Sequence, residues 1–307
     1  MTHLMHRAGW ACAAALALAL TAALSRSIFA GPLDPPAPPG ATQPQVEPRS
    51  PIPPVGWSGT FPIVISQPGS YFLTRSLTVA TQVSAIQIAA SDVALDLNGF
   101  TLTGTGSSVG SPVGVEVRGV QKNLSVRNGN LHSWFAGVDA SDDATDYATQ
   151  SRYEDLQVTN NTNYGIYVDS GSAVRRVIAQ QDGTGIQIAD RGSVYEGGMI
   201  EDSTVTENSV GVAVNANNVT VRNCVIDSTV SNGVNVYKSF DVVEGNTIQG
   251  SGSGAGVNIL GGTVTTVTHN IFSNLAAGAV TGAGVSDRIG PSDSTLAGTQ
   301  PWSNAGP

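Results

Sequence analysis

A repeat of about 24 residues dominates the middle of the sequence. Each unit carries a glycine just before or within a short β-branched segment, and a second strand-like alternation follows. The seven glycines are Gly114, Gly137, Gly165, Gly185, Gly211, Gly233 and Gly256. A unit this short cannot bury its own apolar side chains. The repeat therefore predicts a β-solenoid, in which coils stack about 4.8 Å apart around one shared core.

A second set of positions, most of them polar, recurs in step with the glycines. Its members are Asn128, Asp155, Arg176, Asp202, Asn223, Asn246 and Asn270. The distance from each marker to the next glycine is 9 or 10 residues, whereas the distance from glycine to marker varies from 11 to 18. The nearly constant arm of the repeat, which runs from marker to glycine, favours a solenoid over an ordinary β-sandwich. We expect the glycines to supply unusual backbone angles at corners, and the Asn and Asp side chains to stack as ladders.

Two units fit this spacing imperfectly. In most units an apolar residue precedes the marker by two positions, but Val243 and Val267 precede Asn246 and Asn270 by three. We interpret this as a local β-bulge in those coils. Near the start of the repeat, 61–65 and 71–73 have strand character on either side of a Gln-Pro-Gly-Ser turn. This pattern predicts a hairpin-like piece that caps the first coil.

The chain divides into four expected segments. Residues 1–30 resemble a secretory signal, because Arg7 precedes a 14-residue apolar run that is short for a membrane span. Residues 31–56 are a proline-rich, disordered linker, residues 57–290 form the solenoid, and residues 291–307 are a loose tail. We therefore expect a secreted, periplasmic or cell-surface protein, with a retained N-terminal anchor as the alternative.

The charge balance narrows the partners. Without residues 1–30 the chain has 12 basic and 23 acidic residues, which argues against nucleic acid and an anionic membrane as partners. It also argues against polyanionic sugars unless a cation bridges them. Cys224 is then the only cysteine, so no internal disulfide is expected, and the thiol is interpreted as a packed core residue.

Several segments resemble a known group of proteins. These are "VALDLNGFTLTG" at 93–104, "QPGSYFLTRSLTV" at 67–79, "NVTVRNCVI" at 218–226 and the ending "DRIGP…QPWSN". They are similar to secreted bacterial right-handed parallel β-helix proteins of the pectin-lyase-like superfamily. The resemblance implies an all-β, single-stranded right-handed parallel β-helix of about nine or ten coils. It also implies a role with carbohydrate, since the superfamily includes pectate lyases, polygalacturonases, alginate lyases and epimerases, and phage tailspikes.

The other arm of the repeat, which runs from glycine to marker, varies in length. This variation indicates where a binding face could lie, because insertions in a solenoid emerge as loops on one side. The arm is long at 138–154 and at 186–201, and it is shortest between them, from Gly165 to Arg176. Two protruding loops that flank a recessed coil predict a notch about 10 Å wide, which is two strand spacings. Strand parity turns Tyr167, Asp169 and Arg175 outward on its floor, and Trp134 lies one coil earlier.

The side chains expected in the notch suit a polysaccharide groove, with aromatic rings stacking on sugar and carboxylates holding hydroxyls or Ca²⁺. The predicted substrate-binding residues are Trp134, Tyr167, Asp169, Arg175 and Tyr195. The predicted ligands of a bound Ca²⁺ are Asp139, Asp142, Asp143 and Asp146. No other cofactor is expected. A solvated acidic loop without a ligand is the competing interpretation.

Enzymatic templates match only in part. A Ca²⁺-dependent uronan lyase would use Asp169 with Arg175 or Arg176 as the base, and the residue types allow this. The chain lacks the motifs that accompany the catalytic residues of polygalacturonase-type hydrolases and of alginate-type epimerases. His132 and His269 are its only histidines outside residues 1–30. The sequence therefore favours polysaccharide binding without catalysis, with a lyase and a passive surface rod as the alternatives.

Overall fold

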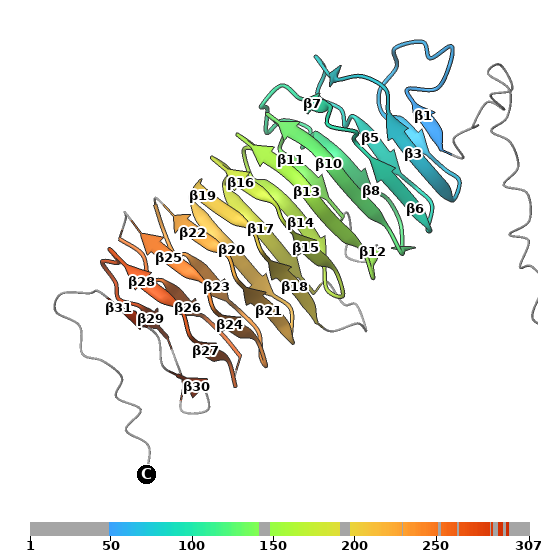
Figure 1. Ribbon diagram of the computed structural model, residues 1–307. Helices are drawn as coiled ribbons and strands as arrows, with labels where there is room; N and C mark the ends of the chain where they lie inside the picture. Colours follow the sequence, from blue (N-terminus) through green and yellow to red (C-terminus); the bar gives the residue numbers. More distant parts are fainter. Residues whose placement is uncertain are drawn as a thin grey trace, which may run out of the picture. The chain divides into compact units, whose positions relative to one another are not determined.

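The computed structural model describes residues 49–140, 148–190, 197–228, 230–250, 253–262, 264–282, 284, 288–290 and 293–294. Within these ranges the chain forms strands joined by turns, and no α-helix is present. No helix there is long and apolar enough to cross a membrane. The strands stack side by side as successive coils of a parallel β-helix (Figure 1).

Each coil contributes strands to three faces. Face 3 is a ten-stranded parallel sheet. Its strands are β2 (Ile63–Ile65), β5 (Ile86–Ile88), β8 (Val113–Val117), β11 (Ala136–Asp139), β14 (Tyr164–Asp169), β17 (Thr184–Ala189), β20 (Val210–Asn215), β23 (Val234–Val236), β26 (Val257–Ile259) and β29 (Val280–Thr281). Its ten strands confirm the predicted number of coils.

Faces 1 and 2 share one larger sheet, because β10 (Ser125–His132) and β13 (Arg152–Thr159) run through both. Face 1 also holds β1 (Ser50–Ile52), β3 (Gly69–Leu73), β6 (Val93–Asp96), β15 (Ala173–Arg175), β18 (Gly198–Glu201), β21 (Val219–Arg222), β24 (Val242–Glu244), β27 (Thr266–Thr268) and β30 (Arg288–Ile289). Face 2 also holds β4 (Leu77–Thr78), β7 (Thr101–Thr103), β16 (Ile178–Gln180), β19 (Thr204–Asn208), β22 (Val225–Ser228), β25 (Thr247–Gly250), β28 (Ile271–Ser273) and β31 (Asp293–Ser294). A separate short pair is β9 (Gln121–Lys122) with β12 (Ala148–Thr149).

The first coil corrects one prediction. β2 pairs with β5 on face 3, and β3 pairs with β1 and β6 on face 1, always in parallel. The expected hairpin-like cap is therefore wrong, since β2 and β3 are successive strands of a coil and lie on different faces. Strand pairing also begins at Ser50, which is N-terminal to the start expected near residue 57.

The interior is one continuous apolar core that runs along the stack. Side chains from all three faces alternate inward, as Ile186 and Ile188 do on β17 and Val219 and Val221 do on β21. Most of these side chains have no solvent exposure. Because each coil is only one strand thick in the stacking direction, its apolar side chains are covered by the coils above and below.

The seven repeat glycines form a column near the start of the face 3 strands, but the reason differs from the one predicted. None of them has the left-handed φ of a corner. A Cβ on Gly137 would lie 2.6 Å from the carbonyl oxygen of Gly165, and one on Gly211 would lie 2.5 Å from that of Gly233. The column also presses on inward side chains, since a Cβ on Gly211 would approach Ile226 to 2.6 Å. Glycine is required here for close approach between coils.

The left-handed backbone occurs at corner residues other than these glycines, and one such series lies at the corner between faces 1 and 2. The residues there with φ between 50° and 64° are Asn98, Asn128, Asp155, Arg176, Asp202, Asn223, Gly245 and His269. The first five predicted markers thus share one corner, Arg176 included. The last two markers were misaligned by one residue, because Val221 pairs with Val243, which pairs with Val267. The bulge predicted there is wrong, and a register shift lies instead between Thr206 and Asn208 on β19.

The ladders of corner side chains are present. Asn246 donates from its backbone nitrogen and from Nδ2 to Oδ1 of Asn270, at 2.9 and 3.0 Å. At the corner between faces 2 and 3, Asn161 donates in the same way to Oδ1 of Asp182, at 2.8 and 2.9 Å. Asp182 in turn donates from its backbone nitrogen to Oδ1 of Asn208. Each buried side chain in these ladders satisfies the backbone of the preceding coil.

Two ladder positions hold a buried aspartate where an amide would fit. Asp182 is 4% exposed and Asp241 is 1% exposed. Oδ2 of each has no hydrogen-bond partner among the described residues. Burial raises the pKa of Asp182 to about 8 and that of Asp241 to about 7, although the hydrogen bonds they accept oppose the shift. At neutral pH the Asp182 carboxyl, with a pKa of about 8, therefore stays largely protonated in the folded chain, and the Asp241 carboxyl, with a pKa of about 7, is about half protonated.

The first prediction concerns the glycine column. Gly211→Ala should lower the free energy of unfolding by about 1–3 kcal/mol, because the added methyl overlaps the backbone of the next coil. Urea unfolding followed by circular dichroism measures the change. Val225→Ala, at an exposed site of the next coil, is the control and should change stability by less than about 0.5 kcal/mol. Equal effects of the two substitutions would show that close contact between coils is not limiting.

The second prediction concerns pH. The folded pKa of Asp182 lies above its unfolded value of 3.8, so the unfolded chain loses its proton first as pH rises. Stability should therefore fall between about pH 4 and pH 8. Asp182→Asn removes this penalty, so the variant should be more stable than the parent at pH 8, with the difference shrinking toward pH 4. Denaturant unfolding across this range checks it. Exposed Asp202→Asn is the control, and a matching gain there would contradict the assignment.

Candidate functional site

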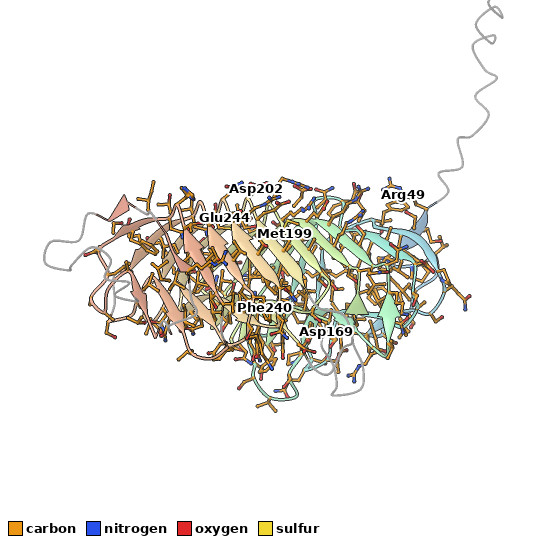
Figure 2. The ribbon with its side chains drawn as sticks, turned by 90° about the horizontal axis from the view of Figure 1, so that it is seen from below. Arg49, Asp169, Met199, Asp202, Phe240 and Glu244 are labelled. Atoms are coloured by element: carbon orange, nitrogen blue, oxygen red, sulfur yellow. The ribbon has the colours of Figure 1, made fainter. Side chains whose placement is uncertain are left out.

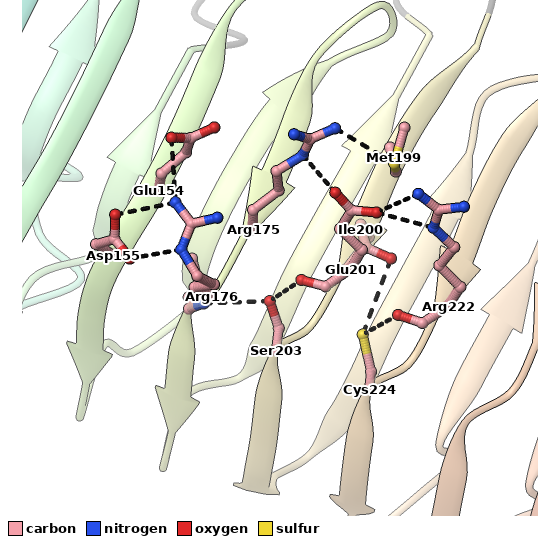
Figure 3. Close-up of polar contacts among 11 residues, drawn as sticks. Glu154, Asp155, Arg175, Arg176, Met199, Ile200, Glu201, Ser203, Arg222 and Cys224 are labelled. Carbon is pink, nitrogen blue, oxygen red and sulfur yellow. Dashed lines mark hydrogen bonds and ion pairs between the residues drawn. The ribbon is translucent and has the colours of Figure 1, made fainter.

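Face 1 carries a column of charged side chains that accounts for Arg175. Equivalent positions of successive strands pair in register from β6 to β24, and the sign of the charge alternates at every coil. The column is Asp96, Arg127, Glu154, Arg175, Glu201, Arg222 and Glu244. Arg175 Nε lies 2.6 Å from Glu201 Oε1, and Arg222 Nη2 lies 2.6 Å from Glu201 Oε2 (Figure 3). The two arginines thus bind one largely buried carboxylate from both neighbouring coils.

Arg176 is held in a similar way at the adjacent corner. Its guanidinium binds Asp155 through Nε at 2.7 Å and Nη2 at 3.0 Å, and it also reaches Glu154 at 3.3 Å (Figure 3). The hydrogen bond from Arg176 lowers the pKa of Asp155, and the same bond raises that of Arg176. A guanidinium engaged with two carboxylates is a poor general base. Arg175 and Arg176 therefore serve the stacking of coils on face 1.

Trp134 is a core residue, so the prediction that it stacks on sugar is wrong. It has no solvent exposure, and its Nε1 donates to the carbonyl oxygen of Leu102 at 3.0 Å. Gly104 and Gly114 lie against its ring. Cys224 is also buried, and burial raises the pKa of its thiol to about 11. This agrees with its interpretation as a packed thiol.

Asp169 ends β14 and is fully buried, together with Ser170 and Ser172 of the corner that follows. Nearby Tyr153 is also fully buried, which is the main reason why its pKa is raised, and the charges of Asp169 and Asp139 add to the shift. Asp169 is therefore not on a solvent-facing floor. Figure 2 shows Asp169 near the lower edge of the view, away from Glu244 of the charged column. Asp169 ends β14 on face 3, whereas Arg175 ends β15 on face 1 and Arg176 follows it at the next corner.

The remaining candidates lie partly outside the described residues. Asp142, Asp143, Asp146 and Tyr195 fall in that class, so their predicted roles stay predictions. The two long arms both run from face 3 to face 1, between β11 and β13 and between β17 and β18. These two connections stand two coils apart, with the connection from β14 to β15 between them. No group of three or more His, Cys, Asp or Glu side chains that could hold a metal is present in the part of the chain that the structure describes.

An open cleft lies on the outer surface of face 3, across β8, β11 and β14. Its volume is about 350 Å³, within the range of small-ligand sites. Its lining residues are Gly110, Ser111, Val113, Glu116, Arg118, Phe135, Asp139, Asn163, Tyr164 and Tyr167. Two of the predicted residues, Tyr167 and Asp139, are therefore neighbours in one cleft. The cleft extends from the Tyr167 coil toward the N-terminal end, rather than being centred on that coil.

The regular register explains which side chains reach the cleft. Glu116 pairs with Asp139, and Asp139 pairs with Tyr167, on three successive strands. All three stand two residues after a glycine of the repeat column, and inward Val115 and Ile166 beside them lie in the core. This position faces outward in every coil, where it continues as Gln187, Ala213, Asn235 and Asn258. Adjacent members stand one strand spacing apart, about 4.8 Å.

Aromatic rings form one part of the cleft. The rings of Tyr164 and Tyr167 lie 4.6 Å apart between centroids and are tilted by 40°. Phe135 meets Tyr164 edge to face, at 6.4 Å and 85°. Tyr167 is only 5% exposed because its neighbours cover it, whereas Tyr164 and Phe135 are partly exposed. Tyr164 and Phe135 therefore supply the accessible aromatic surface of the cleft, and Tyr167 packs behind Tyr164.

Charged groups form the other part. Arg118 Nη2 lies 2.7 Å from Glu116 Oε1, and Gln87 Nε2 donates to Glu116 Oε2 at 3.3 Å. The Glu116 carboxylate is thus held by one cation and one amide. Asp139 adds a second carboxylate one coil further along. The lining therefore combines aromatic faces, two acidic groups and one ion-paired base.

Sequence reasoning missed Glu116, Arg118, Phe135 and Tyr164. The signal for Glu116 was present, since it holds the same place after Gly114 as Asp139 holds after Gly137 and Tyr167 after Gly165. Comparing outward positions along the glycine column would have joined the three. The contribution of Gly110 and Ser111 could not have been found this way, because they belong to a connection outside the repeat pattern.

Comparisons with known proteins agree with this architecture. Residues 144–288 match the family model described as "Right handed beta helix region". The chain is a right-handed parallel β-helix. This confirms the fold that the sequence resemblance implied, which is the pectin-lyase-like fold. No curated protein sequence matches the chain.

Similar solved structures share the fold at low sequence identity. The Dettilon tailspike protein has a TM-score of 0.52 and 13% identity, over 76% of this β-helix chain and 60% of its own. The A-module of the Azotobacter vinelandii mannuronan C-5 epimerase AlgE6 has a TM-score of 0.44 and 16% identity, over 74% and 81%. The periplasmic alginate epimerase AlgG has a TM-score of 0.47 and 10% identity, over 77% of each chain. At these identities the likeness concerns the fold alone.

The third prediction tests the charged column of the β-helix. Glu201→Gln keeps the shape of the side chain but removes the anion between Arg175 and Arg222. The free energy of unfolding should fall by about 1–3 kcal/mol, because two charge-assisted interactions of a nearly buried carboxylate are lost. Glu244→Gln, at the half-buried end of the column, is the matched control with a smaller loss. A loss in Glu201→Gln no larger than that in Glu244→Gln, measured by denaturant unfolding, would show that the double ion pair at Glu201 adds no further stability.

Proposed function

We propose that this β-helix protein binds extracellular polysaccharide through the face 3 cleft around Tyr164 and Tyr167. The observation that carries the proposal is the aromatic cluster of the cleft, which lies beside carboxylate and amide groups on a regular scaffold. Sugar rings present an apolar face of C–H groups and a rim of hydroxyls. Aromatic rings with adjacent polar groups complement both parts.

The dimensions of the cleft suit an extended chain. It crosses three strands, β8, β11 and β14, which are separated by two strand spacings or about 10 Å. This is about the width of a sugar ring with its substituents. Because the cleft is open and the outward polar column continues along face 3 to Asn235 and Asn258, a longer polymer can extend beyond it. Asn163 and Ser111 at the cleft supply further polar groups for hydroxyls.

The proposal places the protein outside the cytoplasm. It rests for this on the N-terminal segment, in which Arg7 precedes the apolar run at 11–24 and Ile28-Phe29-Ala30 offers a cleavage point. The acidic balance of the chain agrees with a sugar partner rather than a nucleic acid. Structures named as epimerases of alginate and as a tailspike share the fold, and they supply no residue-level argument.

A chemical step is not part of the proposal. The lyase hypothesis needs a base near the carboxylates, but Arg175 and Arg176 are engaged in ion pairs on face 1. The cleft lies on face 3 and contains no histidine or lysine among its lining residues. Binding requires only the groups that are present.

The fourth prediction tests this function. The purified chain should bind at least one class of polysaccharide on a glycan array, and Tyr164→Ala should weaken that binding about 5- to 10-fold, because an aromatic contact at the entrance is lost. Isothermal titration calorimetry measures the affinity. Phe240→Ala is the control, since Phe240 is 53% exposed, lies in the connection between β23 and β24, and does not line the cleft.

Two results would contradict the proposal. If the chain bound no neutral, acidic or amino polysaccharide on the array, the result would favour a passive rod, which is the alternative that the sequence left open. Equal effects of Tyr164→Ala and Phe240→Ala would place binding away from the cleft. Thermal unfolding of both variants establishes that each remains folded.

A further inference from the structure

A second pocket lies at the N-terminal end of the described solenoid and is separate from the face 3 cleft. It forms beside the segments that follow β1 and β3, two strands that pair on face 1 (Figure 1). Its volume is about 290 Å³, at the lower end of the range of small-ligand sites. Its lining residues are Pro53, Pro54, Gly56, Trp57, Thr74 and Arg75, and none of them lines the cleft.

Hydrogen bonds fix the two segments that form the pocket. The Trp57 nitrogen donates to the carbonyl oxygen of Pro54 at 3.1 Å and closes a turn. Gly56 in this turn has a φ of 80°, which glycine adopts without strain. Thr74 donates to the carbonyl oxygen of Ile52 from its backbone nitrogen at 2.9 Å and from its hydroxyl at 3.1 Å. The walls of the pocket are therefore built by the fold itself.

Arg75 is the charged residue of the lining, and the indole of Trp57 positions it. Its guanidinium carbon lies over the Trp57 ring, 5.8 Å from the centroid. The ring is held in turn, since its Nε1 donates to the carbonyl oxygen of Thr60 at 3.0 Å and Phe61 meets it edge to face at 5.0 Å. Among the residues that the structure describes, no carboxylate forms an ion pair with Arg75. A guanidinium that stacks on an aromatic ring keeps the N–H donors of its rim for a ligand.

The environment of this guanidinium differs from that in the charged column of face 1. Arg175 and Arg222 both bind Glu201, so their donors are used between coils. The lining around Arg75 is positive, although the chain has a formal net charge of −9. Because salt screens charges beyond about 8 Å at physiological ionic strength, the local cation governs which ligand is attracted.

The lining suits one sugar unit that carries a carboxylate. A guanidinium offers two parallel N–H donors to a carboxylate, and such charge-assisted bonds are stronger than neutral ones. Pro53 and Pro54 supply apolar surface for the C–H groups of a ring, and the Thr74 oxygen can accept a hydrogen bond from a sugar hydroxyl. A pocket of this volume holds a small unit, whereas a polymer needs an open groove such as the face 3 cleft.

We propose that this N-terminal pocket binds a single carboxylate-bearing sugar unit, with Arg75 on the carboxylate and the two prolines against the ring. The site is additional to the face 3 cleft and does not depend on the polysaccharide binding proposed there. The acidic balance of the chain disfavours a polyanion, but a single carboxylate meets mainly the local cation.

The test compares two glycosides on the full chain at pH 7 by isothermal titration calorimetry. Methyl glucuronide and methyl glucoside share the same ring and differ by the carboxylate. The glucuronide should bind about ten-fold more tightly, because the glucoside cannot form charge-assisted hydrogen bonds with Arg75. Acetate is a carboxylate without a sugar ring, and it should compete about ten-fold more weakly than the glucuronide, since it lacks the contacts of the ring.

Variants tie the preference to the pocket. Arg75→Gln should bring the glucuronide-to-glucoside affinity ratio to about one, and Arg75→Lys, which keeps the charge without the planar fork, should restore part of it. Arg152→Gln is the matched control, since Arg152 is an exposed arginine of β13 that does not line the pocket. Tyr164→Ala changes the face 3 cleft and should also leave the ratio unchanged. Thermal unfolding shows that each variant keeps the fold.

The outcomes separate this inference from the proposed function. No binding of the glucuronide, equal affinity for the two glycosides, or a ratio that survives in Arg75→Gln overturns it. Acetate that competes as well as the glucuronide would reduce the pocket to a simple anion site and would also overturn it. Loss of glucuronide binding in Tyr164→Ala would assign the acidic sugar to the cleft instead. A chain that binds the glucuronide through Arg75 but no polysaccharide would retain this inference and lose the proposed function.

Discussion

Contact between consecutive coils at backbone distance is the constraint on which the rest of this structure depends. No coil has a core of its own, so every apolar side chain is covered only if the next coil stacks directly on it. At the start of face 3 the backbones approach so closely that a Cβ on Gly165 would lie 2.5 Å from the carbonyl oxygen of Gly185. The glycine recurs in the sequence because this contact requires it in every repeat unit. It fixes the register of face 3, and therefore which side chains point outward.

Polar groups inside such a stack must be matched from coil to coil, and the protein does this in two ways. Uncharged ladders such as Asn246 on Asn270 satisfy the backbone at the corners. On face 1 the alternating column centred on Glu201 places opposite charges at every step. If one coil were skipped in the stack, side chains of like charge would face each other. The alternating charges therefore favour the observed stacking of consecutive coils. The buried Asp182 is an exception to this matching of polar groups, because its raised pKa makes the free energy of unfolding depend on pH.

The candidate site shows how far residue patterns lead. Tyr167 and Asp139 were expected in one notch, and the structure brings them into one cleft because their strands pair in register. Trp134 was misjudged because an aromatic residue near a corner can point either way, and here it fills the core between two glycines. Arg175 was assigned to chemistry because its ionic partner Glu201 lies 26 residues away in the chain and one coil away in space.

The sequence by itself determined the fold class and the number of coils, because a stacked solenoid repeats the same local rules in every unit. The marker shift at Asn246 and Asn270 shows the limit of this reasoning, since a one-residue error in phase changes which residue occupies a corner. Only the tertiary structure decided which outward side chains meet. Glu116, Tyr164 and the connection at Gly110 come together through stacking and through a loop that follows no repeat. Contacts between coils depend on the path of every connecting segment, and the sequence of a single repeat unit does not determine that path.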